Sequence, residues 1–439
     1  MGLTALLARV ATGAPVPVFA VAGPGTRSLI RDFRLRPEIR LVDTPRPASV
    51  LLVGGLVPAE MEMAVARVHD AMAHPRATVL WSAGAAGLGR PEGFDDAIPV
   101  DGDPVAACVA AYRDILVGRR GSEPPILPDV DPAPWRGVGP YGQGGSGMTG
   151  GVPYGRPMAE LGPDPDGLRL DVLPVAVGPL FPRFPAGLVV DARLAGDLVL
   201  EVEVANLLAN ATAAAPSPEA DPFLRALGER VAIADLELAR ARAHLRSVAE
   251  ALLAAGLEAL ALRALRIAAN LRAGDGALVR RLATIISATQ VLRWSLRGVG
   301  AVPPEAVAGL GAGPVARASG LREDLRLEDP AYRDLGFAPL VDAGGDAAAR
   351  LRLRLGEAVQ SLDLAARAGA RAATATGRVE TPRGRLEAES SASERLFTVL
   401  PSLLREHEWG DVVATIVSLD LDLEEGPLAR GRARPEAAA

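Results

Sequence analysis

Ser49-Val-Leu-Leu-Val53 is an uninterrupted apolar run, which is typical of a strand buried on both faces of a sheet. Pro58–Met72 follows it with apolar residues at helical spacing, and Thr78-Val-Leu-Trp81 is the next strand-like run. Two buried strands joined by a helix form the repeating unit of a parallel sheet that is covered by helices. This stretch therefore predicts that the first third of the chain is a doubly wound α/β fold.

The same alternation extends to both sides of this stretch. Pro17–Ala22 and Ile39–Val42 are expected to be further strands of the sheet. Asp103-Pro104 predicts the start of a helix that runs to about Val117, because Asp is a good N-cap and proline fits the first helical turn. We expect residues 1–121 to form this α/β domain.

The rest of the chain divides into a connector and a second domain. Residues 122–170 are rich in proline and glycine. Their glycine-rich loop, Gly139–Gly151, lacks a following Gly-Lys-Ser/Thr, so we interpret it as part of a connector rather than as a phosphate site. Residues 171–439 begin with strand-like runs as far as Val204. Helical patterns follow at Leu224–Leu252 and at about 257–273, 277–298 and 347–369.

Composition limits the classes of function. The chain has 439 residues, 49% of them hydrophobic, and its net charge of −6 argues against general nucleic-acid binding. Its single cysteine, Cys108, allows no disulfide within the chain, so we expect a reducing compartment and a small buried apolar role for this residue. Met1–Val21 lacks the pattern of a signal peptide, and no apolar run is long enough to predict a membrane span.

Two motifs of the first domain resemble the small subunit of respiratory complex I. Thr44–Gly55 is similar to its Pro-Arg-Gln-Ala-Asp motif and the strand that follows, and Ile98–Asp101 is similar to its Ile-Pro-Val-Asp motif. The resemblance implies that the iron–sulfur ligands of that family would fall near Gly23-Pro24, Ala85 and Asp103. None of these positions is a cysteine, and a cluster is usually held by four thiolates. We therefore predict no metal site and no cofactor.

The second domain resembles the quinone-site subunit of complex I, which is homologous to the large subunit of nickel–iron hydrogenases. Gly178–Pro182 is similar to a Gly-Pro-x-His-Pro motif whose histidine lines the quinone pocket, and Phe181 stands at that histidine. Asp411–Asp420 is similar to a C-terminal strand-forming signature of the family. Further similar motifs are Gly313–Gly320, Asp324–Arg326, the helix motif from Gly345 to Ser361, and Thr381–Gly384.

This resemblance implies a fold class of α/β plus α+β. A flavodoxin-like sheet domain would be followed by a hydrogenase-large-subunit-like helical bundle with a small β lobe. In a hydrogenase, Arg230–Asp235 and Ser418–Asp422 would carry the nickel-binding cysteine pairs. Both stretches lack cysteine, so no hydrogenase activity is expected, and the resemblance is to energy-converting hydrogenase-related complexes with the metal ligands lost.

The resemblance also implies a function. The chain would be a peripheral subunit of a membrane-bound NADH-quinone oxidoreductase-like complex, docked on antiporter-like, ion-translocating subunits at the cytoplasmic face of the inner membrane. It would hold no catalytic residue and no redox cofactor of its own. An alternative is a redox-active subunit that binds quinone or a cluster shared with a partner. Against it, Phe181, Ala348 and Leu351 remove polar groups that would hydrogen-bond a quinone headgroup. A third interpretation is a soluble enzyme of new specificity in the old cleft.

Five charged residues form the sharpest candidate site, namely Arg317, Asp324, Arg326, Asp346 and Arg350. The resemblance implies that they converge between the helical bundle and the small domain. Buried charges persist only when they are paired, because an unpaired one is costly to desolvate. The five residues are candidates either for a charge relay toward a membrane partner or for an ion-pair network that holds the fold.

The histidines carry little functional signal. None of the four has the spacing of a metal-ligand pair. His244 lies in the arginine-rich stretch Arg240–Arg246, so we expect it on a solvated or interface face of a helix. His407, near Trp409 and Asp411, is expected to be structural.

Overall fold

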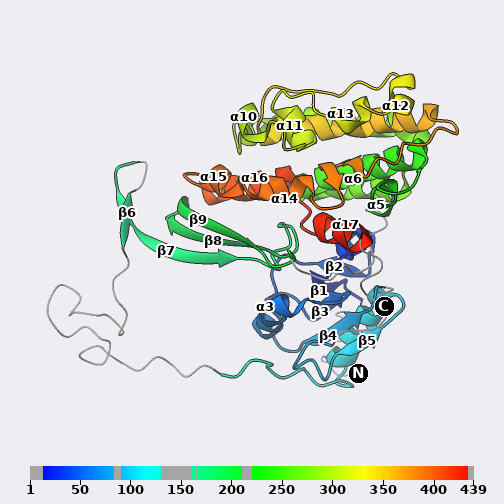
Figure 1. Cartoon of the computed structure of the whole chain (residues 1–439). Helices are drawn as coiled ribbons and strands as arrows, with labels where there is room; N and C mark the ends of the chain where they lie inside the picture. The colour runs from blue at the N-terminus through cyan, green and yellow to red at the C-terminus, as the bar shows by residue number, and fades with distance from the viewer. Residues whose placement is uncertain (1–12, 84–89, 130–159, 164–165, 210–219, 434–439) are drawn as a thin grey trace.

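The computed structural model describes residues 13–83, 90–129, 160–163, 166–209 and 220–433. Figure 1 shows a sheet domain made by the first third of the chain, an antiparallel sheet that extends to one side, and layers of helices made by the rest. The expected combination of a parallel sheet with a helical region is confirmed. Ala85 and the loop Gly139–Gly151 lie outside the described residues.

The first domain contains a five-stranded sheet whose paired strands all run parallel. Its strands are β1 (Val16–Ala22), β2 (Ile39–Leu41), β3 (Val50–Gly54), β4 (Ala77–Trp81) and β5 (Ile98–Val100). Their order is β2-β1-β3-β4-β5, which is the flavodoxin-type order of a doubly wound sheet. The four strands expected from apolar runs are confirmed as β1 to β4. The short edge strand β5 contains Pro99 and has no apolar run that would predict it.

Helices cover both faces of this sheet. α2 (Arg27–Asp32) and α4 (Pro104–Leu116) pack on one face, and α3 (Ala59–Ala71) packs on the other. Successive residues of a strand point to opposite faces, so Leu52 contacts the side of α2 and α4 while Leu51 contacts the side of α3. All five residues of β3 are buried, which explains why its sequence does not alternate.

Local hydrogen bonds begin α4 and hold the segment after it against the sheet domain. Asp103 begins α4 as expected, because its carboxylate accepts a hydrogen bond from the main-chain N–H of Val105 at 3.0 Å. The chain then stays attached to the sheet domain beyond residue 121. Asp70 of α3 accepts hydrogen bonds from the main-chain N–H groups of Ile126 at 3.0 Å and Leu127 at 2.8 Å.

The β lobe is a four-stranded antiparallel sheet. Its strands are β6 (Leu161–Pro163), β7 (Arg169–Val177), β8 (Leu188–Ala195) and β9 (Leu198–Asn206), and they pair in sequence order. The chain turns from β8 to β9 at Gly196-Asp197, where Gly196 has a φ of 62°, in the left-handed region that favours glycine. These strands confirm the β-rich section expected before Val204.

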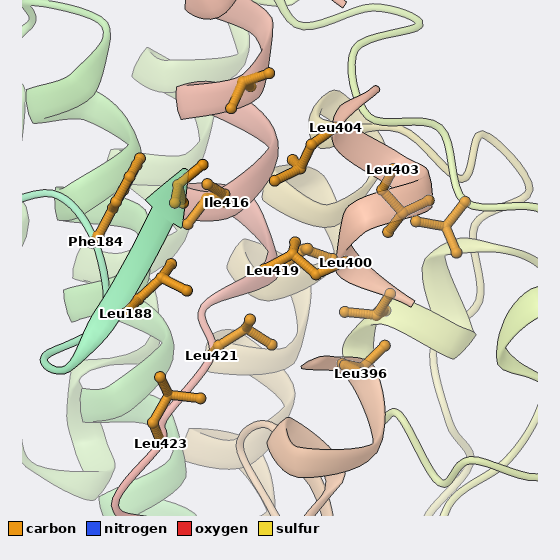
Figure 2. Packing of buried hydrophobic residues seen from close by; sticks show 14 of the residues in the cluster. Phe184, Leu188, Leu396, Leu400, Leu403, Leu404, Ile416, Leu419, Leu421 and Leu423 are labelled. Carbon is orange, nitrogen blue, oxygen red and sulfur yellow. The ribbon is translucent and has the colours of Figure 1, made fainter. Parts of the chain in front are cut away.

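One apolar core joins the β lobe to the C-terminal helices. Figure 2 shows Phe184 and Leu188 facing leucines of α14 (Ala392–Phe397), α15 (Leu400–Leu404) and α16 (Trp409–Leu419). Burying one such side chain stabilises a fold by about 1.5–3 kcal/mol. This core therefore fixes the base of the lobe against the helices.

Two long helices form the centre of the helical region. α6 (Ile233–Ala254) packs along α13 (Ala347–Arg367), and α7 (Glu258–Asn270) and α8 (Gly276–Ser287) complete their core. Sixteen of the 22 residues of α6 are buried, and four charged residues are among them, namely Glu237, Arg240, Arg246 and Glu250. In the described part of the chain, no helix is long and apolar enough to cross a membrane.

The remaining elements are short and connect these layers. They are η1 (Phe33–Leu35), α5 (Asp221–Ala226), η3 (Ala273–Asp275), α9 (Gln290–Ser295), α10 (Pro304–Val307), α11 (Pro314–Ala318), η4 (Leu325–Leu327), α12 (Pro330–Asp334), β10 (Arg378–Thr381), β11 (Gly384–Glu387) and α17 (Glu425–Ala433). The helix expected over 277–298 is interrupted between α8 and α9. The Thr289 hydroxyl there donates to the carbonyl of Ile285 at 3.2 Å, a type of bond that bends helices.

The strand expected over Asp411–Asp420 is wrong, because this segment forms helix α16. Its β-branched residues favour a strand by propensity alone. Val412, Ile416 and Leu419 are spaced four and three residues apart, however, and all three enter the same apolar core. Burial of one helical face therefore outweighs the local preference.

Candidate functional site

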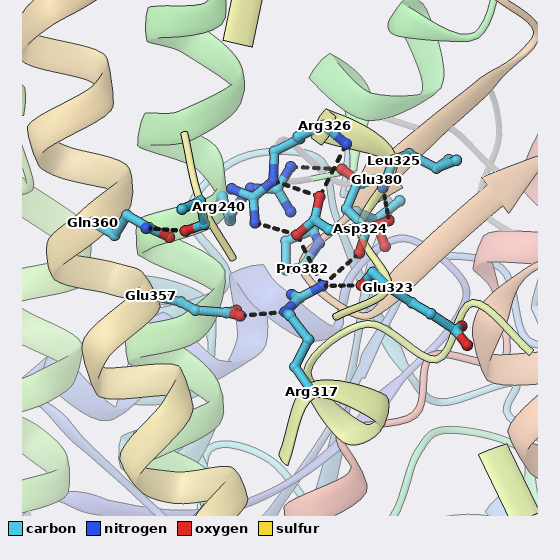
Figure 3. Close-up of polar contacts among 12 residues, drawn as sticks. Arg240, Arg317, Glu323, Asp324, Leu325, Arg326, Glu357, Gln360, Glu380 and Pro382 are labelled. Carbon is cyan, nitrogen blue, oxygen red and sulfur yellow. Dashed lines mark hydrogen bonds and ion pairs between the residues drawn. The ribbon is translucent and has the colours of Figure 1, made fainter. Parts of the chain in front are cut away.

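Seven buried charged residues form what we call the carboxylate-paired cluster. Its members are Glu237, Arg240, Arg317, Asp324, Arg326, Glu357 and Glu380. They come from α6, α11, the start of η4, α13 and β10, so residues far apart in the sequence meet in one place (Figure 3). None of the seven is more than 8% exposed. Charges at this depth need partners, which the following contacts supply.

Arg317 lies at the centre of the carboxylate-paired cluster. Its Nε donates to Glu357 at 2.7 Å. Its Nη1 lies 2.9 Å from Asp324 and donates to Glu380 at 3.0 Å. One guanidinium group therefore holds three carboxylates together. Arginine suits this arrangement better than lysine, because its planar group carries five N–H donors in fixed directions.

Arg326 and Arg240 hold the other side of the cluster. Arg326 donates to Asp324 at 2.7 Å and to Glu237 at 3.2 Å. Arg240 donates to Glu237 at 3.2 Å and to the carbonyl oxygen of Glu380 at 2.6 Å. The Tyr332 hydroxyl completes the shell of Glu237 by donating to it at 2.7 Å. The cluster thus ties α6 to β10 and to the loop before α12.

The carboxylates of the cluster differ in their electrostatics. Burial raises the pKa of Glu357, but Arg317 and His244 outweigh burial and hold this pKa well below its usual range. At Glu380, burial and then the negative charge of Asp324 raise the pKa to about 7. Glu380 is therefore the member of the cluster whose charge changes near neutral pH.

His244 lies beside this cluster rather than on a solvated face. It is 0% exposed, and its Nε2 lies 3.1 Å from Glu357. Burial lowers the pKa of the imidazole to about 4. The expectation of a solvated or interface face is wrong, because α6 is enclosed by its neighbours and its arginines point into the protein.

Of the five candidate residues, the structure brings Arg317, Asp324 and Arg326 together, while Asp346 and Arg350 lie elsewhere. Asp346 caps α13, accepting hydrogen bonds from the main-chain N–H groups of Ala349 at 2.7 Å and Gly298 at 2.8 Å. These contacts give Asp346 a local role at the start of the helix.

Arg350 is held by neutral oxygen atoms. Its Nη1 donates to the carbonyl oxygens of Gly300 at 3.0 Å and Gly345 at 2.8 Å. Its Nη2 donates to the hydroxyl of Ser418 at 2.8 Å. The side chain therefore satisfies its donors without an ion pair in the described part of the chain.

A second line of charges leads from the helices to the sheet domain. Arg354 lies 3.3 Å from Asp420, and Arg383 lies 3.7 Å from the same carboxylate and 3.3 Å from Asp422. The line ends where Glu424 accepts a hydrogen bond from the main-chain N–H of Gly25 at 2.7 Å. Gly25 follows β1, so this contact joins the C-terminal segment of the described chain to the first domain.

A cavity of about 80 Å³ lies where the sheet domain meets the helices, and Arg27 and Phe181 are among its lining residues. Arg31 pairs with Glu250 of α6 at 2.8 Å, and Arg183 lies 3.5 Å from the same carboxylate. Phe181 packs edge-on against Phe184, with ring centroids 4.9 Å apart. The position that is a histidine in the resembled family is therefore part of an apolar contact here.

Sequence reasoning missed the carboxylate partners Glu237, Glu380 and Glu250. A signal for Glu237 exists, because Glu237, Arg240 and His244 lie three and four residues apart on one face of a mostly apolar helix. Glu380 offers no comparable local signal, since its partner Arg317 is 63 residues away.

The residues at the family's cluster-ligand positions do not fit an iron–sulfur cluster. Gly23 and Pro24 offer no thiolate, and Asp103 caps α4 while pairing with Arg36 at 3.2 Å. Cys108 is 0% exposed in the core between α4 and the sheet, and burial raises the pKa of its thiol to about 12. No group of three or more His, Cys, Asp or Glu side chains suited to a metal ion occurs among the described residues.

Comparisons with known proteins find similarity to one respiratory family. Residues 275–398 match the family model of the 49 kDa subunit of respiratory-chain NADH dehydrogenase. This range contains all five candidate residues. A stretch of 86 residues is 40% identical to an NADH-quinone oxidoreductase protein of Streptomyces coelicolor, covering 18% of this chain and 22% of that protein. The chain thus spans about a fifth of the length of the curated relative it matches.

The solved structures that align with the chain include a chain of the membrane-bound sulfane sulfur reductase, described as an archaeal respiratory membrane complex. The alignment has a TM-score of 0.42 and 18% sequence identity. It covers 59% of this chain and 99% of that chain.

Proposed function

We propose that the chain is a peripheral subunit of a membrane-bound, NADH-quinone oxidoreductase-like complex. It docks on antiporter-like, ion-translocating membrane subunits at the cytoplasmic face of the inner membrane. The observation that carries this proposal is the match of residues 275–398 to the 49 kDa subunit family, because that range includes Arg317, Asp324 and Arg326 of the carboxylate-paired cluster. The resemblance of both domains to energy-converting hydrogenase-related complexes, read from the sequence, supports the same assignment.

The proposal includes the absence of a redox cofactor belonging to this chain. Its support is the donor set at the positions of the family's cluster ligands, where Gly23, Pro24 and Asp103 replace thiolates. Cys108 faces the sheet core, and its raised pKa keeps the thiol protonated at neutral pH. The chain would then transmit conformational or electrostatic changes rather than electrons.

In this proposal the carboxylate-paired cluster is a rigid connection inside the subunit. Each of its three arginines has at least one of the four carboxylates within hydrogen-bonding distance, which favours an ion-pair network that holds the fold over a relay. Glu380 is the exception, because its pKa of about 7 allows it to take up a proton under physiological conditions. Any electrostatic response of the cluster is expected to begin there.

The alternative, a quinone bound beside Phe181, has less support. The cavity at this position is about 80 Å³. An apolar cavity of about 150 Å³ holds one benzene molecule, so a volume of about 80 Å³ offers little enclosed space for a substituted quinone ring. The Phe181–Phe184 contact also replaces the polar partner that a quinone headgroup would need.

Purification of the tagged full-length chain from native membranes in mild detergent tests the proposal. We expect polytopic, antiporter-like subunits to co-purify at a fixed ratio and to be identified by mass spectrometry. An alkaline carbonate wash should release the chain from the membranes, since it is held through its partners. Metal analysis of the isolated chain should find iron and nickel well below one atom per chain.

Two results would contradict parts of this proposal separately. A chain that stays in the aqueous fraction, with no membrane subunit in its purified complex, would overturn the docking role. Stoichiometric iron in the isolated chain, or saturable binding of a quinone analogue that Phe181→Trp abolishes, would favour the redox alternative. Phe223→Trp, on α5 in a separate apolar core, is the control for introducing an indole elsewhere.

A further inference from the structure

The cavity of about 80 Å³ between the sheet domain and the helices has an excess of positive charge in its lining. Four arginines line it, namely Arg27 and Arg31 of α2, Arg34 of η1, and Arg183 in the segment before β8. Among the described residues, Glu250 of α6 is the carboxylate that lines it with them. Buried charges need partners of opposite sign, so the pairing of each arginine decides what the cavity can bind.

Three of these arginines share two carboxylates. Glu250 lies 2.8 Å from Arg31 and 3.5 Å from Arg183. Asp43, which is not part of the lining, lies 3.0 Å from Arg34 and also pairs with Arg183. These ion pairs form a row in which arginines and carboxylates alternate, and the row has an arginine at each end. It therefore carries one positive charge more than its two carboxylates neutralise.

Arg27 adds a second positive charge. It lies one helical turn before Arg31, so the two side chains project from the same face of α2. No hydrogen bond or ion pair joins the side chain of Arg27 to another residue in the described part of the chain. The residue is half-buried, but its nitrogen atoms are not among the enclosed, unpartnered atoms of the described residues, so its guanidinium stays accessible. Burial and then the charge of Arg31 lower the pKa of Arg27, as expected for a cation with too little negative charge nearby.

The carboxylates on the other side of Arg27 interact with other groups. A neighbouring cavity of about 30 Å³, which Arg27 also lines, has Asp422 and Glu424 in its lining. Asp422 lies 3.3 Å from Arg383, and Glu424 accepts a hydrogen bond from the main-chain N–H of Gly25 at 2.7 Å. The lining of the larger cavity includes neither of these carboxylates. The larger cavity is therefore the place where an anion would meet Arg27.

The size of the cavity and the shape of a guanidinium limit the anion. A guanidinium offers parallel N–H donors that match the two oxygen atoms of a planar carboxylate. An apolar cavity of about 150 Å³ holds the six carbon atoms of benzene, so about three or four non-hydrogen atoms fit here by proportion. We propose that this cavity binds a small planar oxyanion, such as formate, which accepts hydrogen bonds from Arg27. The site is independent of the docking role proposed above, and its ligand is a charged group rather than the quinone of the alternative.

Calorimetric titration of the full-length protein, at constant ionic strength and without chloride, tests this site with three probes. Formate has the charge and the size, formamide has the same number of non-hydrogen atoms without the charge, and benzoate carries the same carboxylate on a ring. We expect formate to bind at one site, at least tenfold more tightly than formamide, because formamide gives Arg27 no charged partner. Benzoate should also bind at least tenfold more weakly than formate, because its ring exceeds the volume of the cavity.

Two variants locate the binding site by different means. Arg27→Gln removes the charge without breaking an ion pair among the described residues, and Ala186→Leu reduces the volume of the cavity while it keeps every charge. Each should lower the affinity for formate at least tenfold, and one remains informative if the other fails to fold. Arg67→Gln, at an exposed position of α3 outside the cavity, is the matched control and should leave the affinity unchanged.

Arg27→Lys separates the recognition of charge from a structural effect. Circular dichroism verifies that each variant is folded, and Arg27→Lys should retain more of the affinity for formate than Arg27→Gln does. Equal affinities of these two variants, or native affinity in folded Arg27→Gln or Ala186→Leu, would overturn the proposal. So would a native protein that binds no formate at millimolar concentration, or that binds formamide or benzoate as tightly as formate.

Discussion

Arg317 and Arg350 show two ways of holding an arginine inside the same helical region. Both are 0% exposed. Arg317 lies within 3.0 Å of the carboxylates of Asp324, Glu357 and Glu380, whereas Arg350 donates to a hydroxyl and two carbonyl oxygens. Carboxylates neutralise a guanidinium charge, while neutral dipoles only solvate it. The charge of Arg317 is therefore neutralised by carboxylates, whereas the charge of Arg350 is solvated by neutral oxygen atoms.

The largest effect is expected where a buried charge loses its partner. Arg317→Met should lower the free energy of unfolding by about 3–5 kcal/mol, because Asp324, Glu357 and Glu380 lose their shared cation. Urea denaturation followed by circular dichroism measures this loss. Arg352→Met is the matched control, since Arg352 pairs with Asp342 at the surface and should cost less than about 1 kcal/mol. Equal losses in the two variants would remove the distinction drawn for Arg317.

A smaller loss is expected for Arg350→Met in the same denaturation experiment. This variant leaves neutral carbonyl oxygens of Gly300 and Gly345 without a donor, which costs about 1–3 kcal/mol. No buried carboxylate is left unpaired among the described residues. A loss as large as that of Arg317→Met would show that the two arginines are equivalent and would end the comparison.

The cluster around Arg317 should also respond to pH through Glu380. Its pKa is raised to about 7 in the folded protein, by burial first and then by Asp324, from a reference value of 4.5. The folded state therefore binds a proton that the unfolded state has released, and this contribution to stability is lost as pH rises from 4.5 through 7. Glu380→Gln cannot titrate, so its stability relative to the native protein should increase between pH 5 and pH 8.

Urea denaturation at several pH values in this range measures the difference. Glu387→Gln, on the paired strand β11, is the control for removing a carboxylate from the same hairpin. Parallel curves for the native protein and Glu380→Gln would mean that Glu380 stays ionised throughout, so that all carboxylates of the cluster are fully compensated.

The smallest effect concerns His244. Burial lowers its pKa to about 4, so the ring should stay neutral between pH 5 and pH 8 although it lies 3.1 Å from Glu357. Constant chemical shifts of its ring nuclei, assigned by comparison with His244→Gln, are the expected NMR result. A titration within this range would show that Glu357 is shared between Arg317 and an imidazolium.

Sequence reasoning predicts the elements whose burial is uniform or whose caps are strong. β3 is apolar at every position because both of its faces are covered, and α4 begins at the expected Asp103. α16 is the counterexample, because its β-branched residues give a local strand signal that tertiary packing reverses. Periodicity reports which residues can share a face, but it does not report which partner that face meets.

The candidate site is predictable only in part for a related reason. Arg317, Asp324 and Arg326 lie close in sequence and meet as expected, but Glu237 reaches Arg326 from 89 residues away. Ion pairs between residues so far apart in the sequence produce no local pattern from which they could be predicted. Arg350 shows the opposite limit, since a buried arginine suggests a carboxylate partner and the structure supplies carbonyl oxygens instead.

The contact between Gly25 and Glu424 spans 399 residues. At 5–20 residues per second, a ribosome reaches the second residue roughly 20–80 s after the first. For that interval the newly made sheet domain has to persist with the surface beside β1 uncovered. Biogenesis of this protein therefore includes an interval of incomplete folding, in which a chaperone would protect the partly synthesised molecule from aggregation.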